Sequence, residues 1–362
     1  MTTLDKITPD HPFYSVREIN YIKPRGRRIS EYEAVICYAH IDLDTGWEAP
    51  GGNWKFLGMD GREPVNRANT ALHHPDWYEF RDPSRLWQRP YIRHQTYQEH
   101  SIEAAMQGLE RTGAYAEIDP AWLDPILSRY YEGLAFFEWG MSRAFASVVR
   151  EARSDTLTMT NGFTATDHLR HQQAIALYSL ELREQVRQYQ DGLGRAAWME
   201  DPAFQPARRL VEKLMACNDW AEVMVVADLL IEPLLANFVT TQFFHRFAPR
   251  HGDTVTPVIC MTAENDRARN QAAAVEFVKM MTAEQDRAGR TVPATENREI
   301  LQSWITAWGP EVLEAVDAFA PVFEIPPVQP VKAGDARDQV QSECRGLLAD
   351  IGLRLPIRER AL

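Results

Sequence analysis

The sequence predicts an all-α protein, a bundle of long helices with an extended, largely irregular N-terminal arm. From about residue 85 to residue 320, apolar residues recur at positions i, i+3 and i+4, the period of an amphipathic helix. Strand-type alternation is almost absent, and several periodic segments exceed 25 residues, or roughly 40 Å at 1.5 Å per residue. We therefore expect three parts: an arm over 1–84, the bundle over 85–320 and a C-terminal extension over 321–362.

Residues 1–84 differ in composition from the rest of the chain. They are rich in Pro and Gly, contain the turn strings Asp44-Thr-Gly46 and Pro50-Gly-Gly52, and sustain no helical period. Four of the ten tryptophans lie within or just beyond this segment: Trp47, Trp54, Trp77 and Trp87. The segment is too irregular to build a core and too aromatic for a disordered tail. We expect an arm laid over another surface, and the alternative is a cap on this chain's own bundle.

The helical period divides the bundle into seven candidate helices and adds a short one in the C-terminal extension. These helices span 90–113, 120–152, 163–191, 204–217, 219–247, 258–287, 295–319 and about 336–352. Their boundaries carry the usual residues: Asp119-Pro120 opens the second helix and Asp191-Gly192 ends the third. Pro249 and Gly252-Asp253 end the fifth. The Pro-rich run 325–330 separates the last long helix from the short one.

Composition and charge exclude several classes of protein. Of the 362 residues, 45% are hydrophobic and 25% charged, and the net charge is −12, so we expect a globular protein that binds no nucleic acid. The one basic cluster, Lys23 to Arg28, fits a solvated arm or a contact with an acidic protein surface. The N-terminus lacks the layout of a signal peptide. Widely spaced cysteines without a Cys-x-x-Cys pair indicate reduced thiols in a cytoplasmic protein: Cys37, Cys217, Cys260 and Cys344.

The longest apolar run, Val223 to Val239, bears on whether the chain enters a membrane. It contains Asp228, Glu232 and Pro233. We judge it too short and too charged to span a bilayer. The sequence therefore predicts a buried helix and no membrane association.

Four consecutive predicted helices direct ionisable side chains toward the interior. In chain order these residues are Glu138, then His168 and His171, then Glu232, then Asp266 and Arg269. Their neighbours at helical spacing are largely apolar, as Leu229, Leu235 and Val239 are for Glu232. The order across four helices, more than any single position, indicates a common site.

The string Asp167-His-Leu-Arg-His171 is one substitution away from half of a di-iron site. A carboxylate-bridged di-iron bundle takes a Glu from each of two helices and a Glu-x-x-His pair from each of two others. His171 is in place, whereas His168 stands where the paired Glu belongs. The chain has the frame of such a site without its full set of ligands.

Three interpretations of the interior set remain open. The residues are coincidental buried polar groups; or they form a former metal site that has become a salt-bridged core; or five of them bind one metal ion. The five potential ligands are Glu138, His168, His171, Glu232 and Asp266. Arg269 argues against the ion because its charge would repel a metal. It also offers the donors that buried carboxylates need in place of a metal.

Further motifs follow in order along most of the chain. They are Arg27-Arg-Ile-Ser-Glu-Tyr-Glu33, Asp82-Pro-Ser-Arg-Leu-Trp-Gln-Arg-Pro-Tyr91, Tyr97-Gln98 with Glu103, and the stretch from Asp266-Arg267 through Trp304 to Trp308-Gly-Pro310. Together they resemble the β (small) subunit of the hydroxylase component of soluble bacterial multicomponent di-iron monooxygenases, nearest to the propane 2-monooxygenase type. The resemblance implies a ferritin-like helical bundle.

The resemblance also matches interior residues to the catalytic α subunit of that family. Its corresponding helices carry a Glu, an Asp-Glu-x-Arg-His string, a Glu followed by Thr-Asn, and a second Asp-Glu-x-Arg-His string. Glu138 and Glu232 match the two lone carboxylates, and Asn237 matches the Asn. Ala236 stands where the α subunit has its Thr.

The departures fall on the paired ligands. His168 stands at the first paired Glu, and Asp266 and Arg269 stand roughly at the second pair. Bridging and terminal ligands are thus lost together, as the resemblance implies for a β subunit. We expect no catalytic residue, no cofactor and no metal on this chain, with a salt-bridged core in the place of the metal site.

The resemblance implies a non-catalytic β subunit of an NADH-dependent hydroxylase, cytoplasmic and without a site of its own. Its partner would be an α subunit with the di-iron centre, in an α2β2 complex with or without a γ subunit. A reductase and a coupling protein would serve the complex, which would hydroxylate a small alkane or related substrate. The main alternative is a ferritin-like oxygenase with its own metal site. A helical adaptor unrelated to oxygenases would require the motif matches to be accidental.

Overall fold

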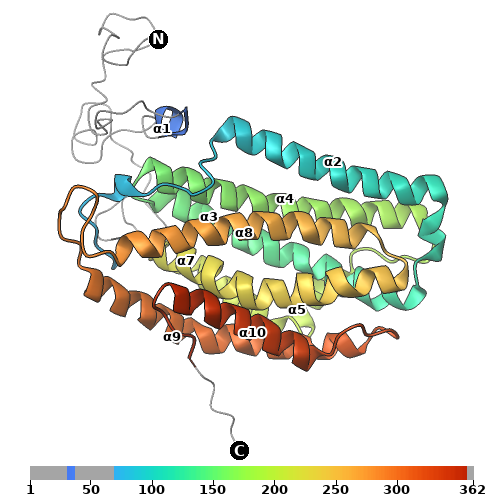
Figure 1. Ribbon diagram of the computed structural model, residues 1–362. Coiled ribbons are helices and arrows are strands. Elements are labelled where there is room, and N and C mark those ends of the chain that lie inside the picture. The colour runs from blue at the N-terminus through green and yellow to red at the C-terminus, as the bar shows by residue number, and fades with distance from the viewer. Residues whose placement is uncertain (1–30, 37–68, 357–362) are drawn as a thin grey trace, which may run out of the picture.

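The computed structural model describes residues 31–36 and 69–356 and confirms an all-α bundle of long helices (Figure 1). In these residues the β-type pairing consists of one isolated antiparallel bridge, between Gln285 and Thr291. The predicted helices are present, although several boundaries differ from those expected.

Four long helices form the centre of the molecule. They are α3 (Glu132–Glu151), α4 (Asp155–Gln185), α7 (Trp220–Val226) with its continuation η5 (Ala227–His245), and α8 (Val255–Met281). Helix α3 packs along α4, and η5 packs along α8. Contacts of α4 with α8 and of α7 with α3 close the unit. This is the arrangement expected of a ferritin-like bundle.

Further helices cover the central unit on opposite sides (Figure 1). Helix α2 (Gln88–Thr112) lies against α4 and α8. On the other side, α9 (Ala294–Phe319) and α10 (Ala333–Asp350) pack against η5. Helices α5 (Leu193–Glu200) and α6 (Gln205–Met215) cover α3. The shorter helices are α1 (Glu31–Ile36), η2 (Trp77–Glu79), η3 (Ala114–Glu117), η4 (Trp122–Tyr131), η6 (Ala248–His251) and η7 (Ala320–Glu324).

Helix α4 shows where the sequence prediction of boundaries was wrong. The predicted helix 163–191 is in fact Asp155–Gln185, because Ser154 caps it by accepting a hydrogen bond from the backbone N–H of Leu157. Its first turns are rich in threonine, and Thr160 donates to the Thr156 carbonyl one turn earlier. Such side chains weaken the apolar period without preventing a helix. Helices α1 and α5 were not predicted, since they are too short to show a period.

The helix that carries Glu232 has an unusually wide turn. Pro233 removes a backbone donor and its ring would clash with the carbonyl four residues earlier. Around it, Ala227–His245 adopts i→i+5 hydrogen bonding, which is typical of functional regions.

Two glycines on α3 allow a close approach of the neighbouring α6 region. A Cβ at Gly140 would lie 2.2 Å from Val211 Cγ1, and a Cβ at Gly133 would lie 2.6 Å from the Phe204 ring. No larger residue fits at either position without moving the neighbouring backbone or side chains. The outer face of α3 is therefore tightly covered here.

The apolar helix Trp220–His251 lies inside the protein. By length and composition it could cross a membrane, so the argument that the run is too short and too charged was wrong. However, 94% of its most apolar window is buried among the other helices. The prediction of a buried helix is confirmed.

The described part of the predicted arm contacts the bundle of its own chain. Asn69 Nδ2 donates to the Glu151 carbonyl at 2.7 Å, and Trp77 makes an edge contact with Trp220 at 5.6 Å between ring centroids. Residues 69–84 therefore pack on this chain's own bundle, as the alternative prediction of a cap requires. Trp47, Trp54 and Cys37 lie outside the described residues, as do most of the residues on which the arm prediction rests.

The described cysteines are free thiols: Cys217, Cys260 and Cys344. Burial raises the pKa of each thiol to about 12. These thiols are therefore protonated and weakly reactive at neutral pH.

Candidate functional site

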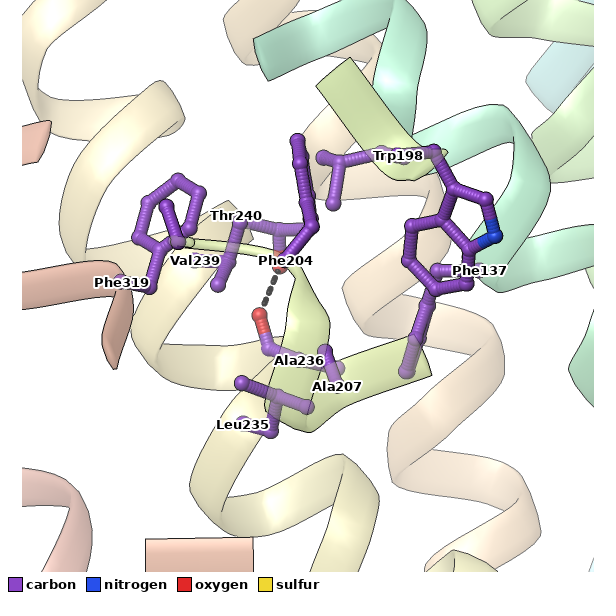
Figure 2. A pocket seen from close by; sticks show the side chains of 11 residues that line it. Phe137, Trp198, Phe204, Ala207, Leu235, Ala236, Val239, Thr240 and Phe319 are labelled. Carbon is purple, nitrogen blue, oxygen red and sulfur yellow. Dashed lines mark hydrogen bonds between the residues drawn. The ribbon is translucent and has the colours of Figure 1, made fainter. Parts of the chain in front are cut away.

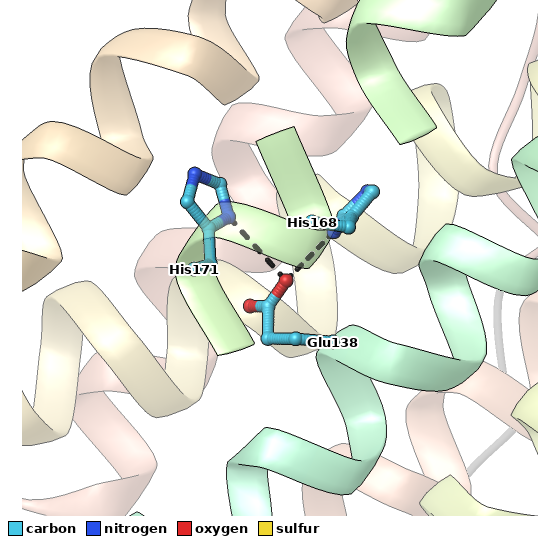
Figure 3. A group of neighbouring side chains, drawn as sticks. All are labelled: Glu138, His168 and His171. Atoms are coloured by element: carbon cyan, nitrogen blue, oxygen red, sulfur yellow. Dashed lines mark hydrogen bonds and ion pairs between the residues drawn. The ribbon is translucent and has the colours of Figure 1, made fainter. Parts of the chain in front are cut away.

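Glu138, His168 and His171 converge at the centre of the four long helices (Figure 3). Glu138 projects from α3, and the two histidines project from successive turns of α4, where a spacing of three residues places both rings on one face. His168 Nδ1 lies 2.7 Å from Glu138 Oε2, and His171 Nδ1 lies 3.4 Å from the same oxygen. All three side chains are buried. The structure therefore brings together three of the residues that the sequence directed inward.

Glu232 on η5 and Arg267 on α8 complete this group. We call it the inner cluster: Glu138, His168, His171, Glu232 and Arg267. His168 Nε2 lies 3.6 Å from Glu232 Oε1. Arg267 reaches between the two carboxylates, with Nε 2.7 Å from Glu232 Oε2 and Nη2 3.7 Å from Glu138 Oε1. Neither Glu232 oxygen makes an aligned hydrogen bond with a described residue, so charge rather than hydrogen bonding holds this pair.

A second group lies between the inner cluster and α2. We call it the outer network: Asp167, Arg170, Asp266 and Arg269, with Tyr91, Gln95 and Gln98 from α2. Asp266 accepts hydrogen bonds from Arg170, from Gln95 at 2.9 Å and from Gln98 at 3.0 Å. Asp167 accepts them from Arg269 and, at 2.8 Å, from the Tyr91 hydroxyl. Both carboxylates have donors on both oxygens.

His171 joins the two groups, and its charge follows from this position. Its Nε2 lies 3.1 Å from Asp266 Oδ2, while its Nδ1 faces Glu138. Burial lowers the pKa of His171, but the hydrogen bonds to Asp266 and Glu138 outweigh burial and raise that pKa to about 9. Burial opposes ionisation of Glu138 and Asp266 as well, yet their hydrogen bonds to His168 and His171 hold both pKa values well below the usual range. The site holds a protonated His171 between two ionised carboxylates.

The prediction that Arg269 is the cation facing Glu138 and Glu232 was wrong. Arg269 belongs to the outer network, where it pairs with Asp167 and Asp266. Arg267 is the cation of the inner cluster, because two residues along an α-helix correspond to about 200° of rotation and point in opposite directions. A signal was present in the sequence: Cys260, Ala263 and Arg267 share one buried helical stripe.

Two further residues matched through the resemblance lie away from the inner cluster. Asn237 is partly exposed, and its Nδ2 donates to Glu343 of α10 at 3.4 Å. Ala236 lines a small cavity whose wall is apolar except for Thr240 (Figure 2). Thr240 donates to the Ala236 carbonyl at 2.7 Å and accepts from Arg267 Nη1 at 2.9 Å.

The cavity lies between α3, α5, α6, η5 and α9. It is lined by Leu134, Phe137, Trp198, Ala203, Phe204, Ala207, Leu235, Ala236, Val239, Thr240 and Phe319. Its volume of about 10 Å³ holds about one water molecule. It is far smaller than a typical substrate pocket.

Asp228 is a buried acid that sequence reasoning did not assign to the site. It lies one turn before Glu232 on η5, and its Oδ1 has no hydrogen-bond partner in the described part of the chain. Burial, reinforced by the nearby charge of Glu232, raises the pKa of Asp228 well above its usual value. The sequence signal was a lone acid in an otherwise apolar run.

The residues of the inner cluster do not fit a two-metal centre. Glu138, His168 and His171 offer ligand atoms within 4.8 Å of one another, but a di-iron bundle uses a Glu from two helices and a Glu-x-x-His pair from two others. Arg267 also lies within the group. At 4 Å, two unit charges repel by about 4 kcal/mol at an effective dielectric constant of about 20, and a divalent ion beside a guanidinium by about twice that.

The fold and the site together define a class of protein. Long antiparallel helices that direct Glu, His and Glu inward in this order form a carboxylate–histidine helical bundle. The family model for the Methane/Phenol/Alkene Hydroxylase family matches residues 54–285, which include every inner-cluster residue. The chain belongs to the methane/phenol/alkene hydroxylase family.

Curated relatives of this chain are β or small subunits of monooxygenase hydroxylases. The chain is 32% identical over 258 residues to the methane monooxygenase component A beta chain of Methylosinus trichosporium, covering 69% of this chain and 64% of that one. It is 25% identical over 348 residues to the propane 2-monooxygenase hydroxylase component small subunit of Rhodococcus jostii, covering 96% and 92%. The chain thus spans just under two thirds of the methane monooxygenase relative. These relatives confirm the predicted class, a β or small subunit of a monooxygenase hydroxylase.

Solved structures of this kind share the fold. A xenon-pressurized phenol hydroxylase from Pseudomonas sp. OX1 superposes with a TM-score of 0.73 at 18% identity, covering 93% of both chains. A toluene 4-monooxygenase structure with toluene bound in its active site superposes with a TM-score of 0.66 at 22% identity, covering 80% of this chain and 93% of that one. At these identities the likeness concerns the arrangement of helices.

Proposed function

We propose that this chain is the non-catalytic β subunit of an alkane-type monooxygenase hydroxylase in the cytoplasm. Its partner is an α subunit that carries the di-iron centre. The complex inserts one oxygen atom of O2 into a C–H bond of a small alkane or a related substrate. NADH supplies electrons through a reductase, and a coupling protein regulates the complex.

The ligand set of the inner cluster is the observation that supports a non-catalytic role. His168 occupies the place of a carboxylate ligand, and Asp266 is committed to Arg170 and Arg269 in the outer network. What remains, Glu138 with two histidines and a charge-paired Glu232, is too few ligands for two irons. The small cavity beside Ala236 offers no room for a substrate. The chain therefore contributes structure rather than chemistry.

The test is to purify this chain alone and together with an α partner that contains two Asp-Glu-x-Arg-His strings. We expect the chain alone to hold substoichiometric iron and to show no oxygenase activity with reductant and O2. The co-purified complex, with its reductase and coupling protein, is expected to hydroxylate propane. Activity confined to the α-containing sample supports the proposal.

The alternative function is an oxygenase with its own metal. The convergence of Glu138, His168 and His171 favours it, since three ligands and a water suffice for one metal ion. Under this alternative the isolated chain contains one or two irons and turns over a substrate. Glu138→Ala or His171→Ala would then remove both the iron and the activity, which would refute the non-catalytic role.

For the assembly we propose an α2β2 complex, with or without γ, in which residues 1–84 act as an arm that helps to hold α. Residues 69–84 lie on this chain's own bundle, so a deletion should stop before them. Removing residues 1–60 is expected to preserve helicity by circular dichroism and to weaken binding to α in a pull-down titration. Unchanged binding with loss of cooperative unfolding would show that the segment is a cap instead.

A further inference from the structure

The position of Arg267 indicates why the inner cluster takes no metal. We propose that the Arg267 guanidinium is a built-in cation that occupies the metal position, and that a small neutral residue there opens a site for one divalent transition-metal ion. The inference rests on the proposed function in one respect, that the natural chain works without a metal of its own.

Arg267 is the only described cation whose guanidinium contacts both carboxylates of the inner cluster. It comes from α8, whereas Glu138 comes from α3 and Glu232 from η5. Its Nε and Nη2 lie 2.7 Å and 3.7 Å from the two carboxylates. A cation that holds carboxylates from two helices together does the same electrostatic work as a bound metal ion.

The hydrogen bonds around Arg267 leave carboxylate oxygens of the inner cluster available to a metal ion. Neither oxygen of Glu232 has an aligned hydrogen-bond donor, and Nε and Nη2 of Arg267 have no aligned acceptor, although all these atoms are buried. The aligned bond of the guanidinium goes to Thr240, outside the ligand set. Removing the side chain therefore frees two carboxylates without breaking an aligned hydrogen bond of either one.

The remaining side chains match a particular class of metal ion. Two imidazoles and two carboxylates suit a borderline divalent ion such as Zn²⁺, Co²⁺ or Fe²⁺, while Mg²⁺ and Ca²⁺ prefer oxygen ligands alone. The ligand atoms of Glu138, His168 and His171 already lie within 4.8 Å of one another. Asp266 holds His171 through Nε2 at 3.1 Å, and Nδ1 faces the cluster, where a metal ion would displace its proton to solvent. A carboxylate behind a ligating histidine is the usual support of a metal site.

The experiment is a titration of the full-length chain with Co²⁺, read by equilibrium dialysis, visible absorption and the midpoint of thermal unfolding. The natural chain is expected to bind no Co²⁺ above background. Arg267→Ala is expected to bind about one ion per chain, as one ligand set of this size allows. Its visible spectrum should show Co²⁺ in a protein site, and Co²⁺ should raise its unfolding midpoint.

Three control variants locate the effect. Arg170→Ala removes a guanidinium with the same 9% exposed side chain as Arg267, but from the outer network, and should bind no Co²⁺. Arg267→Lys keeps a positive charge and should bind none. Arg267→Ala combined with His168→Phe should lose the ion that Arg267→Ala gained. Uptake by Arg170→Ala, or retention in the double variant, would contradict a site at the inner cluster.

A second variant with a neutral residue at position 267, Arg267→Gln, covers the case in which Arg267→Ala does not fold without metal. If Arg267→Ala and Arg267→Gln both fold and bind no Co²⁺, or if neither folds even with Co²⁺, the inference is overturned and the proposed function stands. If the natural chain itself binds one Co²⁺ that His168→Phe removes, the non-catalytic role fails. The two failures are therefore distinguishable.

Discussion

The inner cluster and the outer network share helices α4 and α8 and are buried to a similar degree, yet they satisfy their charges differently. In the outer network, every oxygen of Asp167 and Asp266 accepts at least one aligned hydrogen bond. In the inner cluster, Glu232 accepts none and relies on the charge of Arg267. The carboxylates of the outer network are therefore fully hydrogen-bonded, whereas the Glu232 carboxylate of the inner cluster still has oxygens that could bind a ligand.

The difference comes from α2. This helix lies outside the four central helices and contributes Tyr91, Gln95 and Gln98, whose hydroxyl and amide groups reach Asp167 and Asp266. No described hydroxyl or amide side chain reaches Glu232, which faces apolar neighbours and charged partners. Buried charges are well stabilised only when hydrogen bonds accompany the opposite charge. Donors from the covering helix α2 thus help to satisfy the carboxylates of the outer network.

Arg269→Leu should produce the largest effect, a loss of about 3–5 kcal/mol in the free energy of unfolding, because it leaves the buried Asp167 without its cation. Combining Arg269→Leu with Asp167→Asn should recover part of this loss, since both changes act on one ion pair. Combining it with Glu232→Gln should be additive, because Glu232 pairs with Arg267 instead. Denaturant titration of six proteins, the natural chain, the three single variants and the two double variants, measures both cycles. Additivity with Asp167→Asn would show that Arg269 does not pair with Asp167, and coupling with Glu232→Gln would show that the two groups form one network.

The second effect concerns His171, the residue shared by both groups. Because the pKa of His171 is raised from 6.5 to about 9, its protonated form stabilises the fold fully below pH 6.5. This contribution is lost as the pH rises through 9. The shift corresponds to roughly 3 kcal/mol. His171→Gln should flatten the dependence of unfolding free energy on pH between 6.5 and 9. Parallel curves for the natural chain and His171→Gln would mean that His171 is neutral in the folded protein.

The smallest effect should come from replacing Asp228, which belongs neither to the inner cluster nor to the outer network. Burial raises the pKa of Asp228 above that of an unfolded Asp, which is near 4. The contribution of its protonated form to stability is therefore fully present below about pH 4 and is lost as the pH rises through the higher pKa of the folded state. At pH 7, Asp228→Leu should stabilise the chain by about 1–3 kcal/mol, because an unsatisfied buried polar group is removed. Thermal unfolding at pH 4 and pH 7 checks the sign, and the gain should be larger at pH 7. Destabilisation at both values would indicate that Asp228 has a partner essential to the fold.

Much of the architecture could be predicted from the sequence because helices depend on local spacing. The periods that predicted α2, α6, α9 and α10 are properties of single segments. The same periods placed Glu138, His168, His171 and Glu232 on inward faces. Helix ends were less predictable where side chains such as Ser154 and Thr160 bond to their own backbone, as in α4.

The sequence by itself determined that carboxylates and histidines face one interior, since a residue's face follows from its position along its own helix. Only the tertiary structure decided which cation meets which carboxylate, giving Arg267 to Glu232 and Arg269 to Asp167. Pairing depends on how α8 is rotated against α4 and η5, and on the donors that α2 brings from more than 160 residues away in sequence. Rotation and long-range contacts arise from packing of whole helices, which local spacing does not specify.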